Sequence, residues 1–398
     1  MHAVCSRAYL YVPIVVHHIG RGLDAAGVQA DHAWALAILS LFAVGMALAE
    51  FPSGVFADWA GRVRSVQVFG ACYAVGMLCY LWPERLWLVA VGQLLLGVGT
   101  GFLTGADTAL LHQHLELTGR GDQFGRKLAR LRFWNAVGLV AGPGVGGLLY
   151  EWWWPSVWLG TIGLQLAGVV VMQGIAESPR PHAGRRYRDV LGDALRFAGR
   201  DRRFLVLVAV AAAGSALFAF AIWTIQIHLR AEDAPPRVWG LAVAVCWAIT
   251  AAAQPVSAWI GHTPARSARA WPWLLAALPA GFAAVWGLQL AGLPAAASAV
   301  IVGTAAGVTL YRNACHVQLQ HLVPDALRAS IVSLWNWLAS LWYVACFPLF
   351  GWLLDRGGPV AGWGWIAAAS GALVATLLAG AAVAGAWRGT LNAPPRVP

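Results

Sequence analysis

The sequence predicts an all-α integral membrane protein with twelve transmembrane helices, arranged as two six-helix bundles that are pseudo-repeats of each other. Three observations lead to this prediction. Hydrophobic residues make up 59% of the chain and charged residues only 11%, whereas soluble domains are roughly 45–50% apolar. Apolar runs of about 20 residues, long enough to cross the hydrocarbon core of a bilayer, recur along the whole chain. The two halves of the sequence also share short motifs.

The apolar runs place the spans in order along the chain. The expected spans are 3–19, 33–56, 65–82, 86–111, 130–150, 156–176, 204–228, 238–260, 271–290, 295–318, 329–354 and 360–387. The first run contains Tyr, Pro and two His and has no small-residue cleavage site, so we interpret it as a span rather than a signal peptide.

The longest hydrophilic segment separates the spans into two sets of six. We expect an N-terminal bundle at 1–176, a cytoplasmic linker at 177–203, a C-terminal bundle at 204–387 and a cytoplasmic tail at 388–398. The linker stretch "YRDVLGDALRFAGR" has apolar residues at helical spacing among charges. This pattern predicts an amphipathic helix on the membrane surface.

Two pairs of motifs indicate that the second bundle repeats the first. Trp134-Asn135 in span five matches Trp335-Asn336 in span eleven, and "EFPSG" in span two matches "AQPVS" in span eight. The proline of the first stretch, Pro52, is expected to end its helix. Repeated halves of this kind are typical of transporters, whose substrate sites lie between the repeats near the bilayer midplane.

The arginines determine the expected orientation in the membrane. The net charge is +10 and almost all basic residues are Arg. Loops rich in Arg stay on the cytoplasmic side of a membrane. If both termini are cytoplasmic, the only arginines that fall in outer loops are Arg21, Arg85, Arg230, Arg237 and Arg356. We therefore expect a multi-pass protein of the inner membrane with both termini in the cytoplasm. The positive charge then serves orientation and not nucleic-acid binding.

The stretch "EFPSGVFADWAGRVR" follows the apolar part of span two and is unusually polar. Its two glycines permit a tight turn and close helix approach, and its second acid is placed to bond a helix N-terminus or to pair with an arginine. By spacing and position, Gly54, Asp58, Gly61, Arg62 and Arg64 resemble the signature loop of the major facilitator superfamily. The resemblance implies a gate on the cytoplasmic side.

A second motif lies in span five. Four glycines and a proline thin and bend a helix, so that it packs against a neighbour and adjusts during switching. Gly138, Gly142, Pro143, Gly146 and Gly147 resemble the antiporter motif of drug:proton antiporters in the same superfamily. The resemblance implies export, although the pattern is also compatible with a packing role alone.

Two positions in span four depart from the family pattern. "GQLLLGVGTG" resembles a family segment with an arginine implicated in proton transfer, but Gln93 occupies the matching position. Gln113 and His114 stand where the family has an acid that joins the charge network of the signature loop. Asp107, about two turns deeper, is the nearest acid.

Ionisable side chains at membrane depth cost about 2.5–3.5 kcal/mol on insertion scales, so each is a functional candidate until it is paired. Glu50 either carries a proton or bonds backbone groups near the adjacent proline. Asp107 either couples protons, contacts a substrate cation or pairs with an arginine. Arg312 either serves a substrate or coupling site or snorkels to the cytoplasmic surface. For His17 and His18 we expect solvation at the outer interface, with titration as the alternative.

Uncharged polar and aromatic side chains in the spans are candidates for lining a substrate cavity, with interhelical bonds and packing as the alternative. These candidates are Asn135, Trp223, Gln226, His228, Asn313, Trp335 and Asn336. The sequence has no phosphate loop, metal-ligand cluster or catalytic triad, and its six cysteines lie in apolar stretches. We therefore expect neither an enzyme nor a cofactor.

These observations predict a monomeric secondary transporter of the major facilitator type. It would use the proton gradient to export a small amphipathic organic compound, with Asp58 and Arg62 forming a latch that holds the two halves together in one state. One alternative is a proton-coupled importer of a metabolite. Another is a receptor or membrane partner of the same fold that binds without transport.

Overall fold

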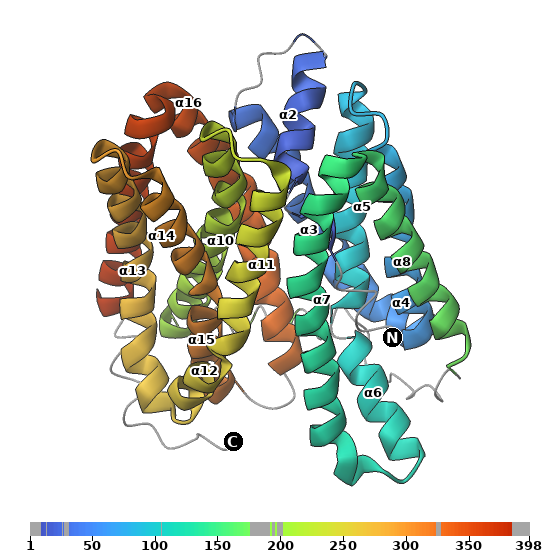
Figure 1. Ribbon diagram of the computed structural model, residues 1–398. Coiled ribbons are helices and arrows are strands. Elements are labelled where there is room, and N and C mark those ends of the chain that lie inside the picture. The colour runs from blue at the N-terminus through green and yellow to red at the C-terminus, as the bar shows by residue number, and fades with distance from the viewer. Residues whose placement is uncertain are drawn as a thin grey trace. The chain divides into compact units, whose positions relative to one another are not determined.

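In the computed structural model of the chain, every regular element among the described residues is a helix (Figure 1). The structure describes residues 9–12, 14–25, 27, 32–104, 106–175, 192, 196, 202–323 and 328–383. The linker predicted at 177–203 therefore lies almost wholly outside the described residues, and with it most of the predicted amphipathic helix. The tail predicted at 388–398 also lies outside them.

The chain divides into two compact units. Unit 1 consists of Met1–Gly184 and Leu229–Ala248, and unit 2 consists of Arg185–His228 and Ile249–Pro398. The segment Leu229–Ala248 thus packs with the first helices of the chain, although it follows the predicted linker in sequence.

Unit 1 is held together by close approaches between helix backbones. Its elements are α2 (Val15–Ala25), α3 (His32–Ala60), α4 (Arg62–Cys79), α5 (Leu86–Leu103), α6 (Ala106–Leu117), η1 (Gly121–Gln123), α7 (Phe124–Trp152), α8 (Pro155–Gln173) and the first part of α11 (Pro236–Ala252). A Cβ atom at Gly97 would overlap the carbonyl oxygen of Phe42, and one at Gly45 would overlap that of Leu94. Small residues therefore allow α3 and α5 to pack backbone to backbone, as in many membrane helix pairs.

Unit 2 is built around α10, the most deeply buried of the described helices that are long and apolar enough to cross a membrane. Its helices are α10 (Arg202–Ala231) up to His228, α12 (Gln254–Gly261), α13 (Pro264–Leu290), α14 (Pro294–Ala306), α15 (Val308–Leu322) and α16 (Arg328–Val383). The Phe220 ring of α10 packs 4.7 Å from that of Phe350 and 5.7 Å from that of Phe347. The Tyr311 hydroxyl donates to the Val210 carbonyl at 2.8 Å, which joins α15 to α10.

Each of the twelve predicted spans overlaps a helix, and several spans are interrupted. Eight helices within the described residues are long and apolar enough to cross a membrane, or nine if α11 and α12, bent by 41°, form one span. The predicted span 86–111 is divided between α5 and α6, and the span 295–318 between α14 and α15. Spans eleven and twelve both lie in α16, which breaks at Gly358 with φ 65°.

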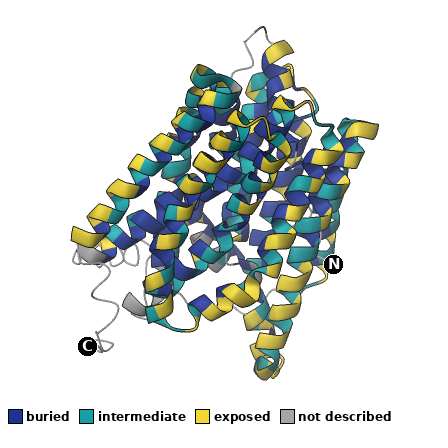
Figure 2. Cartoon of the chain, turned by 60° about the vertical axis from the view of Figure 1, so that its left-hand side comes forward, coloured by how far each residue is buried: buried dark blue, intermediate teal, exposed yellow. Residues whose placement is uncertain are grey.

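Exposed residues recur along the helices rather than only at their ends (Figure 2), and they include large apolar side chains such as Leu148, Val170 and Leu241. Apolar side chains without protein contacts need lipid as their solvent, in agreement with the composition of the chain.

The expectation that span two ends at Pro52 is wrong. α3 continues through Pro52 to Ala60. An interior proline costs one backbone hydrogen bond and bends a helix, but neighbouring helices in a membrane protein compensate for the loss. Gly54 and Asp58 are therefore helical residues and do not lie in the loop that the motif suggested.

Candidate functional site

The turn between α3 and α4 depends on Gly61. This residue has φ 109° and ψ 156°, a combination that only glycine adopts readily. Its N–H donates to the Ala57 carbonyl at 3.1 Å, and its own carbonyl accepts from the Ser65 N–H at 3.1 Å. The turn places Arg62 and Arg64 in the first turn of α4, where Arg64 is exposed and Arg62 half-buried.

Of the acids predicted to act in proton coupling or in the latch, Glu50 is the one whose side chain the structure describes. Glu50 is buried in α3, and the Ser53 hydroxyl donates to its carbonyl at 3.2 Å. The side chains of Asp58 and Asp107 lie outside the described residues. The latch and the Asp107 coupling site therefore remain predictions.

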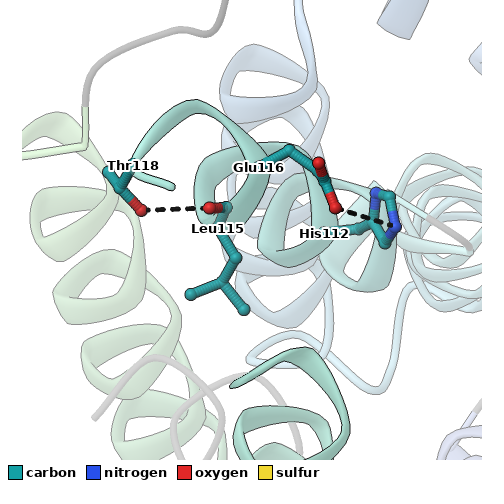
Figure 3. Close-up of polar contacts among 4 residues, drawn as sticks. All are labelled: His112, Leu115, Glu116 and Thr118. Carbon is teal, nitrogen blue, oxygen red and sulfur yellow. Dashed lines mark hydrogen bonds and ion pairs between the residues drawn. The ribbon is translucent and has the colours of Figure 1, made fainter. Parts of the chain in front are cut away.

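The end of α6 carries a carboxylate that sequence reasoning did not single out. Glu116 lies beside Gln113 and His114, the positions where the family pattern has an acid. Its Oε1 is 4.0 Å from Nε2 of His112, one turn earlier on the same helix, while the Thr118 hydroxyl donates to the Leu115 carbonyl at 3.2 Å (Figure 3). This exposed carboxylate therefore has a partner on its own helix.

The five residues of the span-five motif are all buried in α7, and part of this face contacts α11. A Cβ atom on Gly147 would lie 2.6 Å from the Pro236 carbonyl oxygen, and one on Gly240 would lie 2.9 Å from the Gly147 Cα atom. A Cβ atom on Gly146 would overlap the carbonyl of Leu10. The glycines therefore let three segments of unit 1 meet backbone to backbone.

Two ion pairs lie in the same part of unit 1. Arg237 Nη1 is 3.5 Å from Glu151 Oε1, joining the start of α11 to the end of α7. Arg230 Nη2 is 4.0 Å from Asp24 Oδ2 of α2. All four side chains are partly exposed, so these pairs contribute little to stability. The Arg237–Glu151 pair joins α7 to α11, as the glycine face does.

A cluster of aromatic rings around α2 is the main feature that sequence reasoning missed. His18 is fully buried, and its Nε2 lies 2.8 Å from the Tyr80 carbonyl. Its ring lies 4.6 Å from Trp158, which stacks on Tyr80 at 4.6 Å. The expectation that His18 is solvated at the interface is therefore wrong. His18 belongs to α2, Trp158 to α8 and Tyr80 to the end of α4, and no local pattern in the sequence predicts that they meet.

Arg312 lies at the start of the second turn of α15, and its guanidinium lies over an α16 ring. Its Cζ atom lies 5.5 Å from the Trp335 ring centroid, a cation–π geometry. The His316 ring, one turn along the same helix, lies 6.0 Å from the same centroid. The guanidinium is exposed and Trp335 is buried. Two of the predicted site residues thus contact each other.

Two other residues predicted to line the cavity, Asn313 and His228, have hydrogen-bond partners away from Arg312 and Trp335. The Asn313 amide bonds the Ser257 hydroxyl of α12. His228 Nδ1 lies 3.1 Å from the Gln289 amide nitrogen and its Nε2 lies 3.3 Å from the Pro294 carbonyl. These two side chains thus join helices of unit 2.

The remaining cavity candidates lie on three helices. Asn135 of α7 and Trp223 of α10 are half-buried, Gln226 of α10 is buried, and Asn336 of α16 is half-buried beside Trp335. Within the described part of the chain, no group of three or more His, Cys, Asp or Glu side chains could hold a metal ion.

Comparison with known proteins identifies the family. A model described as the Major Facilitator Superfamily matches residues 6–345, and no curated protein matches the sequence at a significant level. The structure resembles that of a D-xylose-proton symporter, with a TM-score of 0.71, 13% identity and 95% of each chain covered. It also resembles an auto-inhibited POT family peptide transporter, with a TM-score of 0.73, 14% identity and coverage of 100% of this chain and 97% of the other.

A nucleoside transporter, NupG, has a TM-score of 0.69, 11% identity and 98% coverage of each chain. Identities this low show the fold alone. The family match extends over most of the sequence, and its members are transporters rather than enzymes. The chain is a multi-pass membrane protein that belongs to the major facilitator superfamily of secondary transporters.

Proposed function

We propose that this transporter exports a small amphipathic organic compound in exchange for protons. The observation that carries the proposal is the glycine face of α7. The motif resembles that of drug:proton antiporters, and its residues Pro143, Gly146 and Gly147 are among those that approach other backbones most closely. Glycines at such a contact let two helices pack closely, and together with the proline they let α7 bend and adjust during a transport cycle.

The remaining expectations belong to the same proposal. The protein lies in the inner membrane as a monomer with both termini in the cytoplasm, and bundles at 1–176 and 204–387 alternate access to a site between them. The proton gradient supplies the energy and no cofactor is needed. Glu50 and Asp107 carry the coupled protons, and Asp58 with Arg62 forms the latch.

The test of direction uses everted membrane vesicles, in which an exporter pumps its substrate inward and releases protons from the acidified lumen. A panel of amphipathic compounds is added one at a time while an acridine dye reports the pH gradient. We expect at least one compound to collapse the gradient only when the transporter is present. Uptake into whole cells stimulated by external acid, without any gradient collapse in vesicles, would instead establish an importer.

The role of the glycine face is tested on the same helix. Gly147→Ala should lower the export rate at least tenfold, because its Cβ atom would meet the Pro236 carbonyl at 2.6 Å. Gly144→Ala is the matched control, since its Cβ atom would make an ordinary contact of 3.7 Å with Ala244. Equal export by the two variants would contradict the role assigned to this contact.

The coupling residues need a separate measurement. Glu50→Gln, Asp107→Asn and Asp58→Asn are compared with wild type for gradient-driven export and for exchange of labelled substrate without a gradient. Loss of export with exchange intact assigns proton coupling to the residue. Gradient-driven export at the wild-type rate in all three variants would exclude both the coupling and the latch assignments.

A further inference from the structure

Arg312 is an isolated charge within the second half of the protein. The six predicted spans from 204 to 387 contain no Asp, Glu or Lys, and Arg312 is their only Arg. A charge facing lipid at the centre of a helix costs about 2.5–3.5 kcal/mol on insertion scales. Because the guanidinium is exposed on unit 2, an aqueous path or a bound anion would avoid this cost.

The stack on Trp335 differs from another arginine–tryptophan stack of the same unit. Arg266 lies 4.9 Å from the Trp259 ring centroid, but it belongs to the first turn of α13 and Trp259 is 62% exposed. Trp335 is only 3% exposed. The Arg312 guanidinium therefore lies over a ring that the protein holds in place, whereas the Arg266 guanidinium lies over a ring that is largely exposed.

Among the described residues, the hydrogen-bond donors of Arg312 and Trp335 have no acceptor. Within the described part of the chain, Arg312 donates no hydrogen bond, and no carboxylate lies within 4.0 Å of it. The buried indole N–H of Trp335 has no acceptor among the same residues. A cation–π contact uses none of the N–H donors of a guanidinium, so two of them can bind two oxygens of one anion.

We propose that Arg312, held over the Trp335 ring, binds the anionic group of the substrate, so that the transported compound is an amphipathic organic anion. The guanidinium binds the two oxygens of a carboxylate or similar group, and the buried Trp335 ring holds the guanidinium in place. This inference rests on the amphipathic substrate of the proposed function, but it does not depend on the direction of transport.

The test uses three probes that share a naphthalene ring and differ in charge. These are 1-naphthoate, the neutral 1-naphthamide and the cation 1-naphthylmethylammonium. Binding to the purified full-length protein in lipid nanodiscs is measured by calorimetry at one pH and salt concentration. We expect naphthoate to bind at least tenfold more tightly than the amide, and the cation to bind most weakly.

Variants of the two arginines then locate the site. Arg312→Gln should remove the preference for naphthoate over the amide, whereas Arg266→Gln should retain it, since both variants lose one charge and one stack. Arg312→Lys keeps the charge without the planar pair of donors, so naphthoate binding should fall several-fold. If Arg312→Gln does not fold, Arg312→Lys and Trp335→Phe provide the same comparison.

The possible failures are distinguishable. Equal affinities for naphthoate and the amide in wild type, no binding of any probe, or an unchanged preference in Arg312→Gln would overturn the anion site. Proton-linked export of a neutral or cationic compound in vesicles would still support the proposed function. Conversely, selective naphthoate binding that needs Arg312, together with uptake rather than export, would support the anion site and contradict export.

Discussion

The turn from α3 to α4 and the turn from α12 to α13 are counterparts in the two halves of the sequence, yet they are built differently. In the first, α3 passes through Pro52 without ending, and Gly61 reverses the chain with φ 109°. In the second, the chain bends by 41° before α12, and Thr263 begins α13 from an extended conformation. The Thr263 hydroxyl accepts from the Arg266 N–H at 3.3 Å.

The difference shows that a repeated residue need not repeat its structural role. Pro255 lies in the first turn of α12, where a proline has no N–H to lose from the helix. Pro52 lies inside α3, where it removes a hydrogen bond. The first turn relies on one glycine, whereas the second relies on a side-chain cap and a proline, so the two should respond differently to substitution.

The largest expected effect is that of Gly61→Ala. An alanine at φ 109° and ψ 156° should lower the free energy of unfolding by about 1–3 kcal/mol, because this region is almost closed to residues with a Cβ atom. The control is Gly261→Ala in the second turn, where the residue is helical and a Cβ atom would lie 3.3 Å from Val317 Cγ2. Thermal unfolding of the purified variants measures the difference. Equal midpoints would show that the first turn does not depend on glycine.

The helices themselves could be predicted from the sequence because lipid imposes a simple length and polarity requirement on each span. The ends of the helices could not be predicted as well. Pro52 failed as a helix end because its lost hydrogen bond is a local cost, and packing of the surrounding helices outweighs it. The break between α14 and α15 likewise falls within an apolar run, where only Gly307 marks it.

Residues of the candidate site could be predicted only where one short stretch of sequence contains an unusual residue type or a known motif. Arg312 was identifiable because a charge in an apolar run is unusual. Its stacking partner Trp335 was one of many tryptophans, and only the tertiary structure singles it out. The burial of His18 and the contact of Gly147 with Gly240 join segments far apart in sequence, so no local pattern predicts them.

A smaller effect is expected at the cap of the second turn. Thr263→Ala removes the oxygen that accepts the Arg266 N–H and should destabilise the protein by about 0.5–2 kcal/mol, the usual cost of losing an N-cap. Thr263→Ser keeps the oxygen and should be close to wild type. Thermal unfolding again provides the measurement, and a Thr263→Ser variant as unstable as Thr263→Ala would show that the methyl group matters rather than the cap.

The smallest effect is expected from replacing the two prolines. The direction of the change in the free energy of unfolding should differ between the two turns. Pro255→Ala should lower the free energy of unfolding by only about 0.4–1 kcal/mol, because alanine adds freedom to the unfolded chain while the first turn of α12 loses nothing. Pro52→Ala should not destabilise the protein, because the entropic loss is offset by an N–H restored to the interior of α3. Thermal unfolding of both variants under the same conditions tests this difference. If Pro52→Ala proved the less stable of the two, the bend at Pro52 would be needed by the packing of α3, and the two prolines would share a structural role after all.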